Sequence, residues 1–312
     1  MLPKDIPKPK RPTFNYYSMD TKWDTQGFLV VPSVFDSEKV AALRTTCLAI
    51  RDKFLACDPL TSQPGGDPRY ETCMRHVNHP FYYRDGQGSL TDILETCAGE
   101  NILDILRQCF NEEPVFRSTS LFFNPTLLHQ EGNWHRDTQF IYKDVSDERE
   151  HLLNMALTGA DEVQVQIPLV ASDDLEYVPG SHHRWDDDHE LWIRRADDEA
   201  HCREELPAGI RIAAAAGDVV VFDNNGIHRG RYFSDQERLT LMVSYTKASA
   251  PPKVDRFCYQ PWFLDDGYLD HLSESATLFY RQFVDHYRAA WQQSAGSLGR
   301  LHSGRRSYTT CK

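Results

Sequence analysis

The sequence predicts an α+β fold in which helices flank a β core. Helical patterns occupy residues 36–110, whereas from about residue 115 apolar runs of strand length alternate with turns that contain glycine. Another helical pattern follows near the C-terminus. Helices followed by many short strands are typical of this class, with a sandwich or a jelly roll as the β part.

The N-terminal part supplies the first elements. Residues 1–22 are rich in proline and lysine, which predicts an N-terminal extension without a regular element. A short apolar strand is predicted at 27–32. Asp36 then caps a helix with apolar residues at helical spacing, and a second helical region covers 91–110, interrupted near Gly99. We interpret both helical regions as packing elements.

The strands and the C-terminal helix complete one domain. We assign residues 23–250 to the β core with its N-terminal helices. Residues 251–312 belong to the same domain and comprise a helix, with one apolar face from Leu272 to Ala290, and a mobile tail from Ser294. Apolar or β-branched runs predict strands at 115–123, 163–170, 210–213, 219–222 and 239–245.

Composition excludes several classes of protein. The 46 acidic residues outnumber the 34 Lys and Arg, and a net charge of -12 opposes a nucleic acid or an anionic membrane as the main partner. The eight cysteines include no Cys-x-x-Cys pair, which indicates reduced thiols rather than a zinc site or a disulfide framework. The N-terminus has no apolar signal segment, and nowhere do 18 apolar residues run together. We therefore expect a cytoplasmic protein.

Part of the acidity is local. Acidic residues gather at 186–190 and again at 197–199. Because runs of like charge usually face water, we interpret this region as solvated surface. The neighbouring histidines His182, His183 and His189 follow no fixed ligand spacing, so we expect a solvated loop here rather than a second metal site.

A candidate metal site begins at His135-x-Asp137. An imidazole and a carboxylate two residues apart on a strand end project to the same side and can bind one face of a metal. His228 stands far downstream, just beyond an apolar strand that follows Gly217-Asp218. Two histidines and a carboxylate would leave the opposite face of an iron ion open for other ligands. Trp134 would face away, toward packing.

A candidate anion site lies ten residues after His228. Arg238 and Thr240 share one face of a predicted strand. A guanidinium matches a carboxylate through its planar fork of donors, and a hydroxyl adds a further hydrogen bond. The pair could hold the far carboxylate of a dicarboxylic cosubstrate.

The order of these motifs resembles that of the phytanoyl-CoA dioxygenase family over roughly residues 23–247. The motifs are Gly27-Phe28, His135-x-Asp137, Val178-Pro179-Gly180-Ser181-His182, Gly217-Asp218, His228 and Arg238. The family consists of Fe(II)- and 2-oxoglutarate-dependent oxygenases. The resemblance implies a double-stranded β-helix core, a cupin-like jelly roll, with flanking N-terminal and C-terminal helices.

The resemblance also implies site residues. Iron would be bound by His135, Asp137 and His228, with no catalytic side chain beyond these ligands. Arg238 would pair with the C5 carboxylate of 2-oxoglutarate, and Thr240 is a weaker candidate for the same end. Ser181 and His182, in the turn of the Val-Pro-Gly-Ser-His segment, would be structural.

The implied reaction uses O2 and 2-oxoglutarate and releases succinate and CO2. It would oxidise an unactivated C–H bond of a small organic molecule, for example in specialised metabolism. Hydroxylation is the default outcome, and desaturation, cyclisation or epimerisation needs only a different fate of the substrate radical. The partner would be this small molecule, and the chain would act as a monomer or homodimer.

One departure from the family pattern and two alternative functions remain open. The family often has glutamine at the position of Arg136; alternation places this side chain opposite the ligands, whereas a side chain that reached the pocket would favour an acidic substrate. Asp137 disfavours halogenation, because related halogenases have a small residue there.

The alternatives are a jelly-roll binding or regulatory protein without oxygenase activity, and a cupin-like metalloenzyme that does not use 2-oxoglutarate. The three ligands with Arg238 oppose the first, and Arg238 with Thr240 oppose the second.

Overall fold

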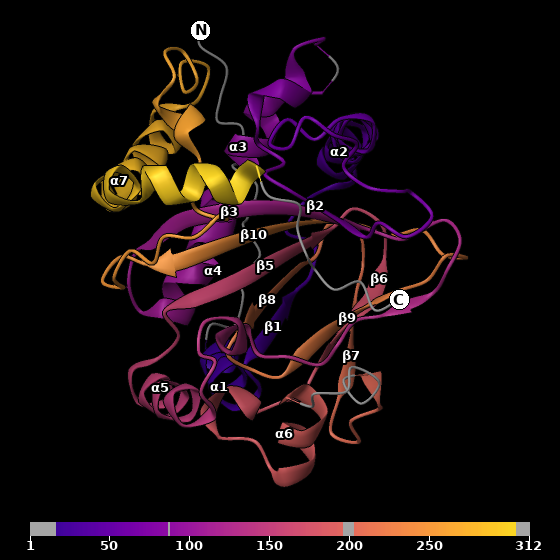
Figure 1. The fold of residues 1–312 in the computed structure, drawn as a ribbon, viewed down its shortest axis with the longest axis vertical. Helices are drawn as coiled ribbons and strands as arrows, with labels where there is room; N and C mark the ends of the chain where they lie inside the picture. The colour runs from indigo at the N-terminus through magenta and orange to yellow at the C-terminus, as the bar shows by residue number, and fades with distance from the viewer. Residues whose placement is uncertain (1–16, 87, 196–202, 304–312) are drawn as a thin grey trace, which may run out of the picture.

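Two antiparallel sheets form the core of the computed structural model, which describes residues 17–86, 88–195 and 203–303 (Figure 1). The larger sheet has six strands in the order β1-β8-β5-β10-β3-β2. The smaller has four in the order β4-β9-β6-β7. The larger sheet consists of β1 (Phe28–Val31), β8 (Val219–Asp223), β5 (Glu162–Pro168), β10 (Leu239–Lys247), β3 (Pro114–Phe123) and β2 (Cys73–Arg75), and the smaller of β4 (Gln130–Glu131), β9 (His228–Tyr232), β6 (Ser172–Tyr177) and β7 (Ile210–Ala214).

The two sheets pack face to face. A buried cluster joins Phe28 and Phe222 of the larger sheet to Leu175, Tyr177 and Ile212 of the smaller one. Strands alternate their side chains between faces, so each strand of the larger sheet gives one set to this interior and the other to the helices outside. This is the α+β fold with a jelly-roll core that the sequence predicts.

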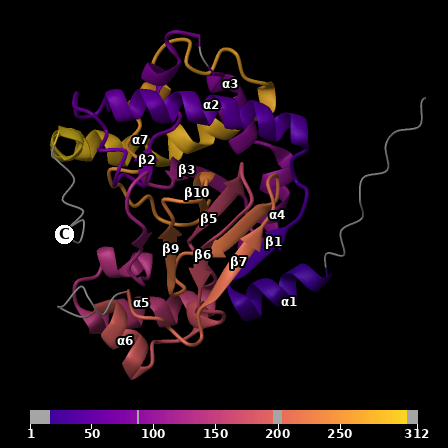
Figure 2. The same cartoon turned by 90° about the vertical axis from the view of Figure 1, so that its right-hand side faces the viewer.

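Helices cover the outer face of the larger sheet. Figure 2 shows α2 and α7 stacked across it, away from the smaller sheet. One large apolar cluster contains residues of the four covering helices and of the strands beneath them. These helices are α2 (Ser37–Ala56), α3 (Leu90–Cys97), α4 (Glu100–Phe110) and α7 (Glu274–Ser303).

The remaining helices lie at the opposite end of the sheets, where α5 and α6 pack below the strands in both views (Figures 1 and 2). They are α1 (Tyr17–Gln26), α5 (Val145–Thr158) and α6 (Asp188–Arg195). Four short 3-10 helices connect elements of the described chain: η1 (Pro80–Tyr83), η2 (Asp137–Phe140), η3 (Ser181–His183) and η5 (Pro261–Leu264). None of the described helices is long and apolar enough to cross a lipid bilayer.

Several predicted elements are confirmed. Asp36 caps α2 by accepting a hydrogen bond from the Lys39 amide at 2.8 Å, and the apolar residues at helical spacing are buried. The interruption near Gly99 separates α3 from α4. The predicted strands correspond to β1, β3, β5, β7, β8 and β10.

Other expectations about the chain termini were wrong. Helix α1 begins at Tyr17, inside the extension that was expected to lack a regular element. Helix α7 continues to Ser303, beyond the point at which a mobile tail was expected to start. The rest of that tail, and the acidic residues 197–199, lie outside the described residues.

The interpretation of residues 186–190 as solvated surface was also wrong in part. The Asp186 side chain is 0% exposed and Glu190 is buried at the start of α6. Both carboxylates have arginine partners, because Asp186 pairs with Arg136 and Glu190 with Arg184. A buried charge is stable only when it is paired in this way.

Candidate metal centre

His135, Asp137 and His228 converge on one point in the structure. The Nε2 atom of His135 lies 3.5 Å from Oδ1 of Asp137, and Nε2 of His228 lies 3.9 Å from the same oxygen. One ligand atom from each residue lies within 4.8 Å of the others. His228 lies 91 residues after Asp137 in the sequence, and the fold brings the three side chains together.

Backbone pairing positions the ligands. His228 is the first residue of β9, and it exchanges two backbone hydrogen bonds with His135, at 3.0 and 2.9 Å. The amide of Asp137 then donates to the carbonyl of Asn224 at 3.0 Å. The His-x-Asp segment therefore lies on a short bridge to the smaller sheet, and Asp137 opens η2 rather than ending a strand.

Carbonyl oxygens fix the orientation of both imidazoles. Nδ1 of His135 lies 2.7 Å from the Asn133 carbonyl, and Nδ1 of His228 lies 2.9 Å from the Gly226 carbonyl. Because a carbonyl only accepts hydrogen bonds, each Nδ1 must carry the ring proton. The lone pair of each neutral ring then lies on Nε2, which faces Asp137. This is the arrangement that metal-binding histidines usually have.

Two amides hold the carboxylate of Asp137. Gln164 of β5 donates to Oδ2 at 2.6 Å, and Asn224 donates to the same oxygen at 3.1 Å. Oδ1 is left facing the histidines. The sequence did not single out either amide as a functional residue. For Gln164 the only signal was its place in a predicted strand, and for Asn224 its place four residues before His228.

The environment of His228 favours the neutral ring. Burial, and secondarily the neighbouring His135, lowers the pKa of His228 to about 4. The ring packs between Phe222 and Tyr177, with centroids 5.1 and 6.4 Å away. Gly226 permits this packing, because a Cβ there would come within 1.8 Å of the Tyr177 hydroxyl.

The donor set fits Fe(II). Two imidazole nitrogens and one carboxylate oxygen on one face are the protein ligands of non-haem iron oxygenases, which leave the other coordination positions open. Each ligand side chain is already oriented by a hydrogen bond at its other nitrogen or oxygen, Nδ1 of the histidines and Oδ2 of the aspartate. Little rearrangement of the protein is therefore needed to bind the ion.

Arg238 and Thr240 are both buried at the start of β10, beside Phe122 of β3. Arg238 is 3% exposed, packs over the Tyr232 ring at 4.7 Å, and donates to the Arg231 carbonyl at 2.9 Å. Its Nε is 3.4 Å from a carboxylate oxygen of Asp174, without hydrogen-bond geometry. Within the described residues, the buried hydroxyl of Thr240 has no hydrogen-bond partner. Both groups therefore have capacity for an anionic ligand.

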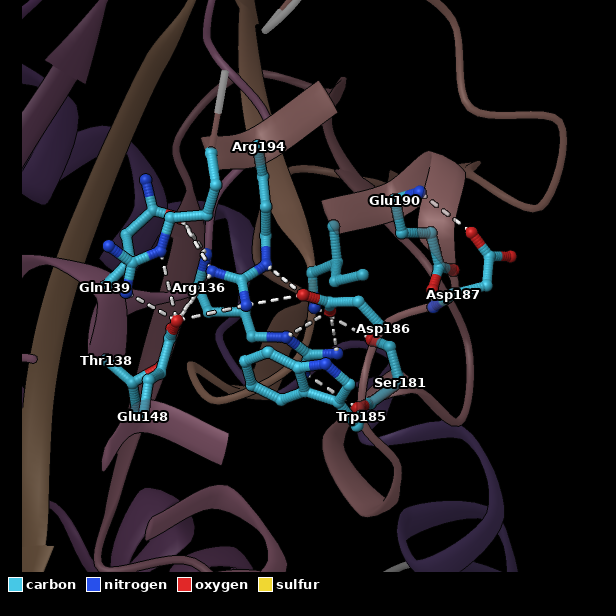
Figure 3. Close-up of polar contacts among 12 residues, drawn as sticks. Arg136, Thr138, Gln139, Glu148, Ser181, Trp185, Asp186, Asp187, Glu190 and Arg194 are labelled. Atoms are coloured by element: carbon cyan, nitrogen blue, oxygen red, sulfur yellow. Dashed lines mark hydrogen bonds and ion pairs between the residues drawn. The ribbon is translucent and has the colours of Figure 1, made fainter. Parts of the chain in front are cut away.

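Other residues that the sequence singled out have structural contacts. Ser181 is buried and its hydroxyl accepts from the Ile227 amide at 2.7 Å, one residue before His228. Trp134 is 1% exposed in an apolar cluster, as expected. The Arg136 side chain is fully buried and binds Asp186 rather than reaching the three ligands (Figure 3). The prediction that it faces away from the ligands agrees with this position.

The chain matches a known protein family. The family model described as phytanoyl-CoA dioxygenase (PhyH) matches residues 23–239. A search of curated proteins finds no match.

Solved structures share the fold at low sequence identity. EctD from S. alaskensis with bound Fe is 16% identical, with a TM-score of 0.53 over 82% of this chain and 85% of its own. HygX from Streptomyces hygroscopicus, with nickel and 2-oxoglutarate bound, is 17% identical, with a TM-score of 0.53 over 74% of this chain and 86% of its own. The epimerase SnoN, in complex with Fe3+, alpha ketoglutarate and nogalamycin RO, is 13% identical, with a TM-score of 0.52 over 77% and 86%.

Proposed function

Because the chain belongs to the phytanoyl-CoA dioxygenase family and is thus an Fe(II)- and 2-oxoglutarate-dependent oxygenase, we propose that His135, Asp137 and His228 bind its iron. The observation that carries this proposal is the convergence of their three free donor atoms within 4.8 Å. When bound, the iron and 2-oxoglutarate activate O2 to oxidise a C–H bond, with release of succinate and CO2. The protein orients the ligands through the carbonyls of Asn133 and Gly226 and the amides of Gln164 and Asn224.

The far carboxylate of 2-oxoglutarate is assigned to Arg238, with Thr240 as a second contact. Tyr232, which lies under the Arg238 guanidinium, shares a face of β9 with His228, because the two are four residues apart on the strand. The proposed iron site and the proposed anion site thus lie along the same strand, β9. The buried hydroxyl of Thr240 would gain the hydrogen bond that it lacks.

The substrate is a small organic molecule with an apolar portion. Phe140 follows Asp137 by three residues, lies 5.4 Å from the His135 ring between centroids, and is 67% exposed. Its neighbour Ile141 is 58% exposed. Exposed apolar side chains beside a candidate centre favour contact with the apolar part of a bound molecule. The acidic net charge disfavours nucleic acid.

An anaerobic titration tests the whole assignment. Fe(II) and 2-oxoglutarate are added to the metal-free protein while the visible charge-transfer band of the chelated iron is recorded. We expect the band to appear and to saturate at one iron per chain. Iron binding without the band would instead indicate a metalloenzyme that does not use 2-oxoglutarate, and no iron binding would indicate a binding protein without oxygenase activity. Succinate release across a metabolite panel then identifies the substrate.

Arg238→Ala is expected to raise the KM for 2-oxoglutarate by at least about tenfold, because a hydrogen bond to a charged group contributes about 1.5–3 kcal/mol. Iron affinity should change little, since the side chain does not touch the three ligands. Succinate release at varied 2-oxoglutarate measures this, with Arg211→Ala, an exposed arginine of β7, as the control. An unchanged KM would mean that Arg238 serves only its contacts within the protein, with Asp174 and the Arg231 carbonyl, and does not bind 2-oxoglutarate.

Phe140→Ala is expected to raise the KM for the organic substrate. Full burial of a phenylalanine contributes about 1.5–3 kcal/mol, so partial burial predicts a change of about 5–10-fold. Steady-state kinetics at saturating 2-oxoglutarate measures it, and the KM for 2-oxoglutarate should stay constant. Leu157→Ala, at the end of α5 and 86% exposed, is the matched control. Equal effects of both substitutions would remove Phe140 from the substrate site.

We propose a cytoplasmic monomer or homodimer, on the basis of the scattered reduced cysteines and the acidic composition. Light scattering of the purified protein distinguishes the two assembly states.

A further inference from the structure

A buried arginine lies in the sequence between two of the proposed metal ligands. Arg136 separates the candidate ligands His135 and Asp137, yet its side chain is 0% exposed and points to the opposite side. An arginine costs several kcal/mol to bury unless every donor finds a partner. The partners of Arg136 therefore indicate what the side chain does.

All five N–H donors of Arg136 are accounted for by five hydrogen bonds. Nε and Nη2 donate to one carboxylate oxygen of Asp186, at 2.9 and 2.7 Å. Nη1 donates to the carbonyls of Ser181 and Asn225, and Nη2 also donates to the Arg184 carbonyl. Two separate segments of the chain, residues 181–186 and the turn that contains Asn225, thus meet on one guanidinium.

The bond to Asn225 lies between two contacts of the metal centre. The preceding residue, Asn224, holds Asp137 through its carbonyl and its side-chain amide. The following residue, Gly226, supplies the carbonyl that orients His228. Arg136 fastens the peptide between these two contacts. Without it, the buried carbonyl of Asn225 would lose its donor, and the turn could shift relative to Asp137.

The bond to Ser181 acts on the same turn from the other side. The Ser181 hydroxyl accepts from the Ile227 amide at 2.7 Å, directly before His228. Arg136 donates to the carbonyl of that serine at 2.8 Å. The residues before His228 are therefore held by Arg136 both directly and through Ser181.

A second buried arginine provides a matched comparison. Arg194 of α6 is also 0% exposed, and it binds Asp186, Glu148 and Gln139 (Figure 3). It belongs to the same charge network as Arg136, but within the described residues its hydrogen bonds go to the side chains of Asp186, Gln139 and Glu148 and not to the turn at 223–226. Loss of either arginine disturbs the network, and only loss of Arg136 releases the turn.

We propose that Arg136 is a positioning residue for the metal centre, which acts through the turn at 223–226 to keep His228 and Asp137 in register. The proposal rests on the proposed iron site. The family often has glutamine at the position of Arg136. A glutamine side chain has two N–H donors, which are too few for these partners, so the proposal also accounts for the arginine here.

Metal titration of the apoprotein tests the proposal without turnover. Co(II) is added to wild type, Arg136→Gln and Arg194→Gln, and the dissociation constant is measured by calorimetry together with the visible d–d spectrum. We expect Arg136→Gln to weaken binding by about 10–100-fold, the range seen when a residue that orients metal ligands is removed. Arg194→Gln should stay within about twofold of wild type with an unchanged spectrum.

Arg136→Lys provides a second test in case Arg136→Gln does not fold. A lysine keeps the charge beside Asp186, but its three donors on one nitrogen cannot reach the same set of carbonyls. We expect near-normal folding, weaker Co(II) binding and an altered d–d spectrum. Wild-type affinity in both Arg136 variants, or equal losses in Arg136→Gln and Arg194→Gln, would overturn the positioning role. Failure of wild type itself to bind Co(II) would count against the proposed iron site instead.

Discussion

Asp137→Ala is expected to abolish oxygenation and to weaken metal binding by more than about 100-fold, since changes in residues that merely orient ligands already cost 10–100-fold. The carboxylate is the only charged member of the proposed ligand set. Its Oδ1 lies 3.5 and 3.9 Å from the two imidazole nitrogens, so no atom of an alanine could replace it. Its removal also leaves the amides of Gln164 and Asn224 without their acceptor.

Metal titration and succinate release measure this effect separately. Asp147→Ala, in the exposed first turn of α5, controls for loss of one acidic residue close by in sequence. Asp137→Asn adds a finer comparison, because it keeps the shape and removes the charge. Full activity of Asp137→Ala would refute the ligand assignment, whatever the behaviour of Arg238→Ala.

The sequence was sufficient to predict elements whose stability is local. Helix α2 combines a capping aspartate with apolar residues at helical spacing, and both signals lie within 20 residues. Strand β8 is a continuous apolar run from Val219 to Phe222, as expected for a strand buried on both faces.

Strands β6 and β9, in which charged residues alternate with or outnumber apolar ones, were not predicted. In β9, whose sequence is His-Arg-Gly-Arg-Tyr, Arg229 and Arg231 lie on the face opposite His228. They pair with Glu176 of the neighbouring β6, which was missed for the same reason. The pairing partners are more than 50 residues apart, so local periodicity carries no trace of them.

The candidate ligands could be predicted, and the residues that hold them could not. His135, Asp137 and His228 have side chains that suit a metal in a recognisable order. Their supports are ordinary amides and backbone carbonyls, which become visible only when the fold brings the two segments together. The burial of Asp186 was missed for a related reason, since its arginine partners lie 50 residues before it and 8 after it.

Glu148→Gln is expected to destabilise the protein by about 3–5 kcal/mol, the typical cost of removing one partner from a buried charge group. The Glu148 side chain is 0% exposed, and it binds Arg194 at 3.0 Å and Arg195 at 2.6 Å. It also accepts from the hydroxyl of Thr138, the residue after Asp137, at 2.8 Å. In the Glu148→Gln variant, Asp186 is the one acidic partner left to Arg194 among the residues drawn in Figure 3.

Urea denaturation measures the loss, with Glu150→Gln on the exposed face of α5 as the matched control. The control should change the free energy of unfolding by less than about 0.5 kcal/mol. Equal effects of the two substitutions would mean that the network contributes no more than surface charges do. Because Thr138 joins Glu148 to the start of η2, the variant should also bind Co(II) more weakly than wild type at temperatures where it is folded. Retention of wild-type affinity would confine the role of Glu148 to stability, and would leave Arg136 as the member of the network that acts on the metal centre.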